Sequence, residues 1–191
     1  MDLDSSQKAL EEPRPEAPSF RFLFETEFSY VWNTLRRLGV LEADVLDQTQ
    51  EVFLVVHSLL PDYDASRPVR PWLFAIAYRL ACRHRSLARH RREVRGDAPY
   101  EPIDRAPSAE QTLEQAEARE LLLEAIQGIE LPRRAVFILS EVEEQPMTEI
   151  ANALQIPVNT AYSRLRMARE DFADAARRIL ARRASAERRA R

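Results

Sequence analysis

The clearest structural pattern in this chain lies at residues 146–169, PMTEIANALQIPVNTAYSRLRMAR. Its first part carries an apolar face formed by Ile150, Ala151 and Leu154. A second apolar stripe follows at helical spacing and consists of Ala161, Leu165, Ala168 and Phe172. Two amphipathic stripes this close together must pack on each other. The pattern predicts a short helix, a tight corner at residues 155–157 and a second helix, which together form a helix-turn-helix.

The polar face of the second helix indicates what the motif binds. At about 100° per residue, the side opposite the apolar stripe presents Asn159, Ser163, Arg166 and Met167, with Thr160 at one border and Tyr162 and Arg169 on the flank. In a helix-turn-helix these side chains would meet a DNA major groove. The alternative is an amphipathic surface helix whose polar face is only solvated. The short partner helix and the corner favour the DNA-reading interpretation.

Composition limits the fold class and the compartment. The chain has 191 residues, of which 45% are hydrophobic, 31% are charged and only three are glycine, which is typical of a globular all-α protein. No apolar run approaches the roughly 18 residues needed to span a bilayer, and the start, Met1 to Asp4, is acidic where a signal peptide would be basic. We therefore expect a cytoplasmic protein without membrane insertion.

The residue types that carry most chemistry are scarce. Cys82 is the single cysteine, so an intrachain disulfide and a Cys-x-x-Cys zinc site are excluded. The glycines are too scattered for a phosphate-cradling loop, and the three histidines lack companions with metal-ligand spacing. We expect no catalytic residue, metal, cofactor or small-molecule substrate, and hence a binding protein rather than an enzyme.

Charge is segregated along the chain. Residues 66–95 hold nine arginines against one glutamate, residues 97–130 hold nine carboxylates against two arginines, and residues 151–191 hold ten arginines against four carboxylates. Two basic modules separated by an acidic segment suit a protein that touches nucleic acid in two places, because the acidic segment is repelled by phosphates. The alternative is two solvated helix faces joined by a disordered acidic linker.

The periodicity along the chain divides it into two small helical modules. Helices are predicted at residues 20–38, ending near Gly39, at 42–60 and at 71–92, and a later helix at 131–142 precedes the helix-turn-helix. The predicted organisation is a flexible tail at 1–19, a first module at 20–92, a flexible linker at 93–112, a second module at 113–176 and a basic tail at 177–191. Fully extended, the linker reaches at most about 65 Å.

Three motifs together carry a family resemblance. They are DQTQEVFL at residues 47–54, RPVRPWLFAIA at residues 67–77, and LPRRAVFIL at residues 131–139 followed by the helix-turn-helix. In this order and spacing, from Phe20 to Ala176, they resemble the extracytoplasmic-function (group IV) sigma factors of bacterial RNA polymerase. Such sigma factors contain only sigma regions 2 and 4, joined by a linker. The resemblance implies a chain that directs core polymerase to promoter DNA and assists transcription initiation.

The resemblance also implies the contact with core polymerase. An acidic helix would face the clamp-helix coiled coil of the largest polymerase subunit, through Asp44, Asp47, Gln50 and Glu51. The alternative is that these residues are the solvated side of the second helix.

The resemblance assigns the −10 promoter element to the first module. The loop with Asp62, Tyr63, Ser66 and Arg67 would capture an unstacked base. One edge of the third helix would line the path of the displaced strand, through Trp72, Arg79, Arg83 and Ser86. Arg89 would hold phosphates. The alternative for Trp72 alone is a core residue.

The −35 element is assigned to the second module. Tyr162, Ser163, Arg166 and Met167 would contact bases and backbone, Thr160 would lie near a phosphate, and Asn159 begins the recognition helix. Family members usually have glycine where Gln155 and Asn159 stand, so Gln155 would adopt positive φ at a cost on the order of 1 kcal/mol. The promoter sequence cannot be transferred from any relative.

One partner and two rival functions stay open. Family members are often held inactive by an anti-sigma factor, but no residue of this chain identifies one. The chain could instead be a stand-alone, dimeric helix-turn-helix regulator of transcription, although no heptad zipper is present. It could also be a helical adaptor that binds proteins through both modules.

Overall fold

The computed structural model describes residues 18–95 and 113–190, and within these ranges the chain forms helices and no strand. Most of the predicted tail at 1–19 and of the predicted linker at 93–112 lies outside the described residues. The all-α fold class predicted from composition and periodicity is confirmed.

The first module consists of three helices that pack pairwise: α1 (Phe20–Leu38), α2 (Glu42–Leu59) and α3 (Val69–Arg95). Ser19 starts α1, because its Oγ accepts a hydrogen bond from the Phe22 amide at 3.2 Å. Ser19 therefore belongs to the helix start rather than to a tail. Gly39 ends α1 in the left-handed conformation, at φ 89°, where glycine meets no steric penalty.

The loop between α2 and α3 begins with a short 3-10 helix, η1 (Leu60–Asp62). The third helix begins two residues earlier than predicted, at Val69, and puts Pro71 in the first turn, where its missing N–H costs no hydrogen bond. It runs to Arg95 and so extends into the segment predicted as linker.

The second module contains α4 (Leu113–Gln127), α5 (Leu131–Phe137), the π-helix η2 (Ile138–Val142), α6 (Met147–Leu154) and α7 (Val158–Ala190). The predicted helix at 131–142 is thus α5 continued by η2. The helix-turn-helix is α6, a corner and α7. Ile150, Ala151, Ala161 and Leu165 are all buried, so the two apolar stripes pack on each other as predicted.

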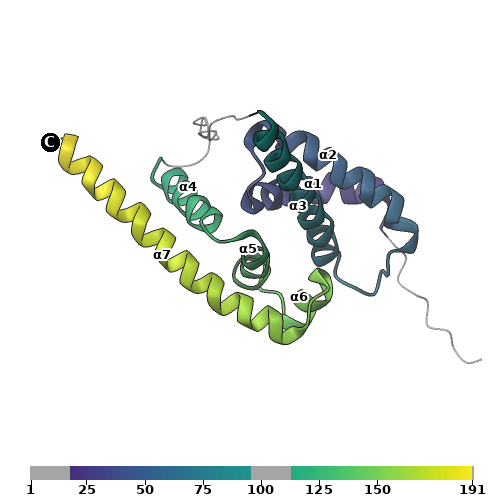
Figure 1. The fold of residues 1–191 in the computed structure, drawn as a ribbon. Coiled ribbons are helices and arrows are strands. Elements are labelled where there is room, and N and C mark those ends of the chain that lie inside the picture. The colour runs from purple at the N-terminus through teal and green to yellow at the C-terminus, as the bar shows by residue number, and fades with distance from the viewer. Residues whose placement is uncertain (1–17, 96–112, 191) are drawn as a thin grey trace, which may run out of the picture.

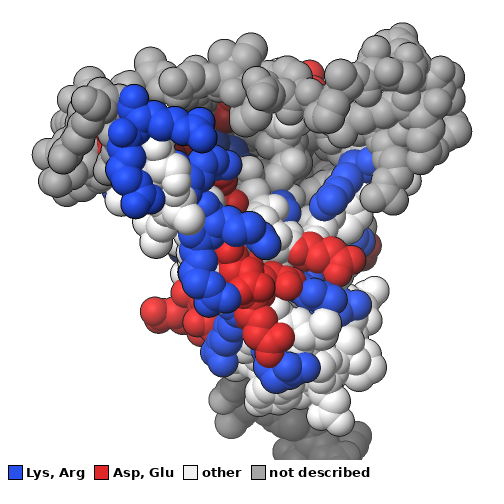
Figure 2. All heavy atoms as spheres, turned by 60° about the vertical axis from the view of Figure 1, so that its left-hand side comes forward, with Lys and Arg blue, Asp and Glu red and all other residues white. Residues whose placement is uncertain are grey.

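The last helix extends beyond residue 176, the predicted end of the second module. α7 has 33 residues and passes without a break through residue 177, so the predicted basic tail continues the last helix, which its sequence had allowed. Figure 2 brings the end of α7 forward and shows arginine side chains gathered there, with carboxylates between them.

The two modules pack against each other. Helix α1 contacts α4 and α5, and α3 contacts α6, so the start of the helix-turn-helix lies beside the third helix of the first module (Figure 1). Two surfaces far apart in the sequence are therefore neighbours in space.

Gln155 closes the helix-turn-helix in a strained conformation. It adopts φ 53° and ψ 48°, while the Ile156 amide donates to the Ala151 carbonyl at 3.0 Å, the hydrogen bond of a Schellman ending. We expect Gln155→Gly to stabilise the chain by about 0.5–1 kcal/mol, because glycine adopts positive φ without a Cβ clash. Urea denaturation of both proteins measures the change. The control, Ala153→Gly inside α6, should destabilise by about 1 kcal/mol; equal effects would contradict the strain.

Candidate nucleic-acid interface

One face of α2 is acidic and solvent-exposed. Asp47, Gln50 and Glu51 are exposed, whereas Asp44 is partly covered, with its Oδ2 3.4 Å from Nε2 of His84 on α3. The opposite face of α2 is buried against α1 and α3 through Val45, Thr49, Val52 and Val56. Because the apolar side fixes the helix, the acidic side is held outward.

Two leucines interrupt this acidic face and were missed from the sequence. Leu54 is 65% exposed and lies about two helical turns after Asp47, and Leu46 is 46% exposed. An apolar centre with a polar rim is typical of protein–protein interfaces. The helical phase of Leu54 was a usable signal, because it coincides with that of Asp47 and Glu51.

The loop after α2 is shaped by its own contacts. The ring of Tyr63 lies 4.6 Å, centroid to centroid, from that of half-buried Trp72, and its hydroxyl donates to the Arg67 carbonyl. Asp64 Oδ1 accepts from the Ser66 amide at 3.0 Å and from the Ser66 hydroxyl at 2.6 Å. Burial, and then the charge of Asp64, raises the pKa of Tyr63. The loop is therefore preorganised around an aromatic pair.

This loop forms one wall of a pocket whose other wall comes from the second module. The pocket has a volume of about 330 Å³. The loop and α3 contribute Asp62, Tyr63, Arg67, Trp72 and Arg79, and α6 with its corner contributes Glu149, Asn152, Ala153 and Gln155. Sequence reasoning did not link the two sets, since nothing local to either one reports the other.

The remaining residues expected to meet the −10 element follow one edge of α3. Arg79, Arg83 and Ser86 are exposed along it. Arg89 lies on the same helix, but its side chain is outside the described residues.

The expected DNA-reading face of α7 is open. Asn159, Ser163 and Arg166 are exposed, and Tyr162 is 58% exposed. Thr160 and Met167 are half-buried at the borders of this face. The Ser163 hydroxyl donates to the Thr160 carbonyl at 3.0 Å, and Arg166 pairs with Glu170 at 2.7 Å. The residues chosen from the helical wheel therefore share one surface.

Arg164 turns away from this face. It is half-buried, and its charge acts on Tyr78 of α3, whose pKa burial raises to about 12. Arg164 thus faces α3 of the first module.

The described part of the chain offers no sign of metal chemistry or membrane spanning. No group of three or more His, Cys, Asp or Glu in it could hold a metal ion. No helix among the residues described is long and apolar enough to cross a bilayer.

Comparison with known protein families identifies the family to which this chain belongs. The model of sigma-70 region 2 matches residues 23–93, and that of sigma-70 region 4 matches residues 119–172. The chain belongs to the sigma-70 family of RNA polymerase sigma factors. The combination of regions 2 and 4, together with its relatives, places it in the extracytoplasmic-function class. The sigma factor directs core RNA polymerase to promoter DNA and assists transcription initiation.

The relatives agree with this membership. The sigma factor is 28% identical over 137 residues to the RNA polymerase sigma factor NccH of Alcaligenes xylosoxydans xylosoxydans, covering 70% of this chain and 74% of NccH. Among solved structures it resembles CnrH in complex with the cytosolic domain of CnrY, at 25% identity and a TM-score of 0.55, over 81% and 85% of the two chains. It shares the fold of RpoE in complex with the anti-sigma factor NepR from Bartonella quintana, at 17% identity and a TM-score of 0.65, over 83% and 96%.

Regions 2 and 4 of this sigma factor are joined by a buried guanidinium. Arg134 on α5 is only 4% exposed; its Nη1 donates to the Leu38 carbonyl of α1 at 2.8 Å. Its other nitrogens donate to the carbonyls of Gln127 and Ile129 in region 4. Burial lowers the pKa of Arg134 to about 10. A Cβ on Gly39 would lie 2.5 Å from Nη1, so glycine at this position makes room for the guanidinium.

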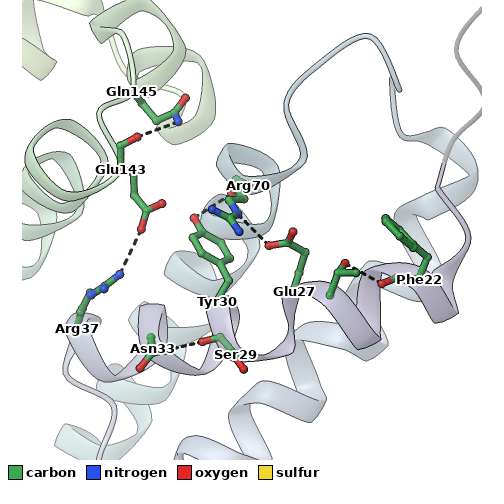
Figure 3. Close-up of polar contacts among 10 residues, drawn as sticks. Phe22, Glu27, Ser29, Tyr30, Asn33, Arg37, Arg70, Glu143 and Gln145 are labelled. Atoms are coloured by element: carbon green, nitrogen blue, oxygen red, sulfur yellow. Dashed lines mark hydrogen bonds and ion pairs between the residues drawn. The ribbon is translucent and has the colours of Figure 1, made fainter. Parts of the chain in front are cut away.

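A second polar contact between the regions is shown in Figure 3. Arg37 of α1 donates to Glu143 Oε1 at 3.2 Å, and Glu143 follows η2. Nearby, the Tyr30 hydroxyl donates to the Arg70 carbonyl at 3.3 Å, and Arg70 pairs with Glu27 at 3.0 Å. Burial raises the pKa of Glu143 despite the opposing effect of Arg37 and Arg70. Neither Arg134 nor Glu143 was singled out from the sequence.

Arg134→Met should destabilise the sigma factor by on the order of 3 kcal/mol, because the substitution leaves buried carbonyls without donors. Arg133→Met is the matched control on the same helix, since Arg133 pairs with Asp171 in a partly exposed position, and its loss should stay below about 1 kcal/mol. Urea denaturation of the full chain measures both. Similar losses from the two variants would contradict the role of Arg134.

Glu143 should make stability depend on pH. A carboxyl whose pKa is raised on folding binds its proton more tightly in the folded chain. Its stabilising contribution is therefore present below the unfolded-state pKa and is lost as pH rises through the folded-state pKa. The free energy of unfolding of the wild type, minus that of Glu143→Gln, should fall as pH rises from about 4 toward neutral. Denaturation across this range tests it, and a constant difference would refute it.

Proposed function

We propose that this sigma factor works through three surfaces. The acidic face of α2 binds the clamp-helix coiled coil of polymerase, through Asp44, Asp47, Gln50 and Glu51. The loop after α2 and one edge of α3 take the −10 element, and the N-terminal half of α7 reads the −35 element. Residues 20–92 then act as region 2 and residues 113–176 as region 4, joined by the linker at 93–112.

The observation that carries this proposal is the exposed acidic face of α2. A chain that only bound DNA would gain nothing from carboxylates held outward near basic surfaces, because phosphates repel them. A protein partner with a complementary basic surface explains the face. The leucines at positions 46 and 54 supply the apolar contact that charges alone lack. The sigma role is therefore favoured over that of a stand-alone regulator.

The chemistry of the loop suits capture of an unpaired base. Base–aromatic stacking is worth about 1–3 kcal/mol per base, and Tyr63 rests on Trp72, which holds its ring in place. Asp62 and Ser66 supply hydrogen-bonding groups that can read a splayed base. The arginines along the loop and α3 attract the phosphates of the displaced strand: Arg67, Arg79, Arg83 and Arg89.

The recognition end of α7 combines base-reading and positioning groups. Arg166 can donate two hydrogen bonds to guanine, and Ser163 can pair with several base edges. Tyr162 and Met167 add apolar contact. Asn159 and Thr160 stand at the helix N-terminus, where amide N–H groups attract a phosphate.

Engagement of both elements requires the two regions to separate. In the compact arrangement, α6 covers one side of the pocket whose other side is the base-capturing loop. Binding of polymerase would open this pocket and break the hydrogen bond from Arg134 to Leu38. The linker, at most about 65 Å long when extended, sets the limit of the separation.

The sigma factor acts without catalysis of its own, in the cytoplasm, where polymerase and promoters meet. Polymerase forms the phosphodiester bonds. RpoE is bound to the anti-sigma factor NepR in its solved complex, and CnrH is bound to the cytosolic domain of CnrY, which supports an anti-sigma factor as a partner here as well.

The double variant Asp47→Arg, Glu51→Arg tests the polymerase contact. Reversal of two charges at the interface should weaken binding to core polymerase at least about 100-fold and abolish run-off transcription. The control Glu25→Arg, Glu144→Arg reverses two exposed carboxylates elsewhere and should leave both readouts near wild type. Wild-type chain that never joins core, yet binds duplex DNA alone as a dimer, would instead support the regulator function.

A further inference from the structure

We propose that α7 carries a second DNA-contacting surface beyond its recognition end. This arginine ridge consists of Arg177, Arg178, Arg188 and Arg189, and it holds phosphates of the duplex that flanks the −35 element. The inference rests on the proposed −35 role of the N-terminal half of α7. It concerns a segment that the region 4 model, which ends at residue 172, does not cover.

The register of the helix puts the ridge on the DNA side. Arg166, Arg177 and Arg188 follow one another at intervals of 11 residues. Eleven residues make about three turns, with a drift of about 20° and a rise of about 16.5 Å. The neighbouring line of Met167, Arg178 and Arg189 has the same spacing. Arginines thus extend the face that carries Arg166 along the uninterrupted α7.

Helix α4 fixes the rotation of this part of α7. Ala175 and Ile179 are buried on the side that packs against α4. Helix α4 also contacts the two arginines that lie between Arg178 and Arg188 in the sequence. Arg182 forms an ion pair with Glu124, and Arg183 forms one with Glu117. Arg177 and Arg188 lie on the side of α7 away from this contact; the side chain of Arg177 is 73% exposed, and its ion pair is with Asp174 of the same helix. Arg178 and Arg189 are exposed at the border of the contact, within about 40° of Arg182 around the helix. Figure 2 shows the arginines of this end at the surface.

The length of α7 determines what the ridge can reach. A helix of 33 residues is about 50 Å long, whereas the major groove is about 12 Å wide. Only the first turns can lie in the groove, and the remainder must pass over the phosphate backbone. Arg177 and Arg178, about 16.5 Å beyond Arg166, approach the groove wall. Arg188 and Arg189, about 33 Å beyond it, reach phosphates when the duplex bends toward the helix.

Three matched double variants test the ridge, each changing one adjacent arginine pair to glutamine: 177/178, 182/183 and 188/189. Glutamine preserves helix propensity, and circular dichroism verifies it. Holoenzyme containing each full-length variant is titrated onto a fluorescent duplex with the −35 element over a series of salt concentrations. The 177/178 variant should lower the magnitude of the salt slope by about 1–2, equivalent to a five- to thirty-fold loss of affinity at about 0.15 M salt.

The other two variants separate contact from net charge. The 182/183 variant should keep the wild-type slope, because both of its arginines are already paired with carboxylates of α4. The 188/189 variant should lose affinity and also reduce duplex bending, measured by energy transfer between dyes at the duplex ends. Losses should be equal on matched and scrambled −35 sequences, because phosphates carry no sequence information.

Three results would overturn the ridge: equal losses from all three pairs, no loss from the 177/178 pair, or reduced transcription with unchanged DNA affinity. The last result would identify an acidic protein surface as the partner. The proposed −35 role of α7 is tested by a separate measurement. Arg166→Gln should reduce discrimination between matched and scrambled sequences. Unchanged discrimination would refute that assignment, while the salt slopes of the pairs still report on the ridge.

Discussion

The buried guanidinium of Arg134 is the interaction on which the compact arrangement depends. It satisfies carbonyls at the end of α1 and at the turn between α4 and α5, two helix ends that would otherwise be buried with unpaired acceptors. Because one planar group serves both regions, their relative position is set by hydrogen-bond geometry and not only by apolar contact. Gly39 is part of the same constraint, since its missing side chain leaves the space that Nη1 occupies.

Each proposed functional surface is the reverse side of a packed helix. Helix α2 is anchored in the core by Val45, Val52 and Val56. Helix α7 is anchored by Ala161, Leu165 and Ala168. The charged sides of both helices therefore face the solvent. Burial of the apolar face of each helix orients its polar face toward a binding partner, so no further structural element is needed to present that face. The same logic explains why the loop before α3 needs contacts of its own, such as the carboxylate of Asp64 and the ring of Trp72.

The features that could be predicted from the sequence are those encoded locally. The ends of α1, the helix-turn-helix and the strained corner at Gln155 follow from periodicity, capping residues and an expected glycine that is absent. Arg134 and Glu143 could not be predicted, because their partners lie 96 and 106 residues away and a single long-range polar contact leaves no periodic trace. The pocket between the loop and α6 was missed for the same reason. Leu54 lay within reach of helical phase, because it falls close to the positions of Asp47 and Glu51 around α2, but it was not singled out.

The packing of α4 on α7 has a mechanical consequence. A Cβ on Gly128 would come within 2.7 Å of the Ala175 side chain, so the two helices are held at close range. Because α7 is one continuous rod, Ser163 lies about 24 Å along the axis from Ile179, where α4 grips it. A tilt of about 5° at that grip would move the reading end by roughly 2 Å, which is more than a hydrogen bond to a base edge tolerates. Small residues far from the proposed recognition face therefore set the direction of the helix that carries it.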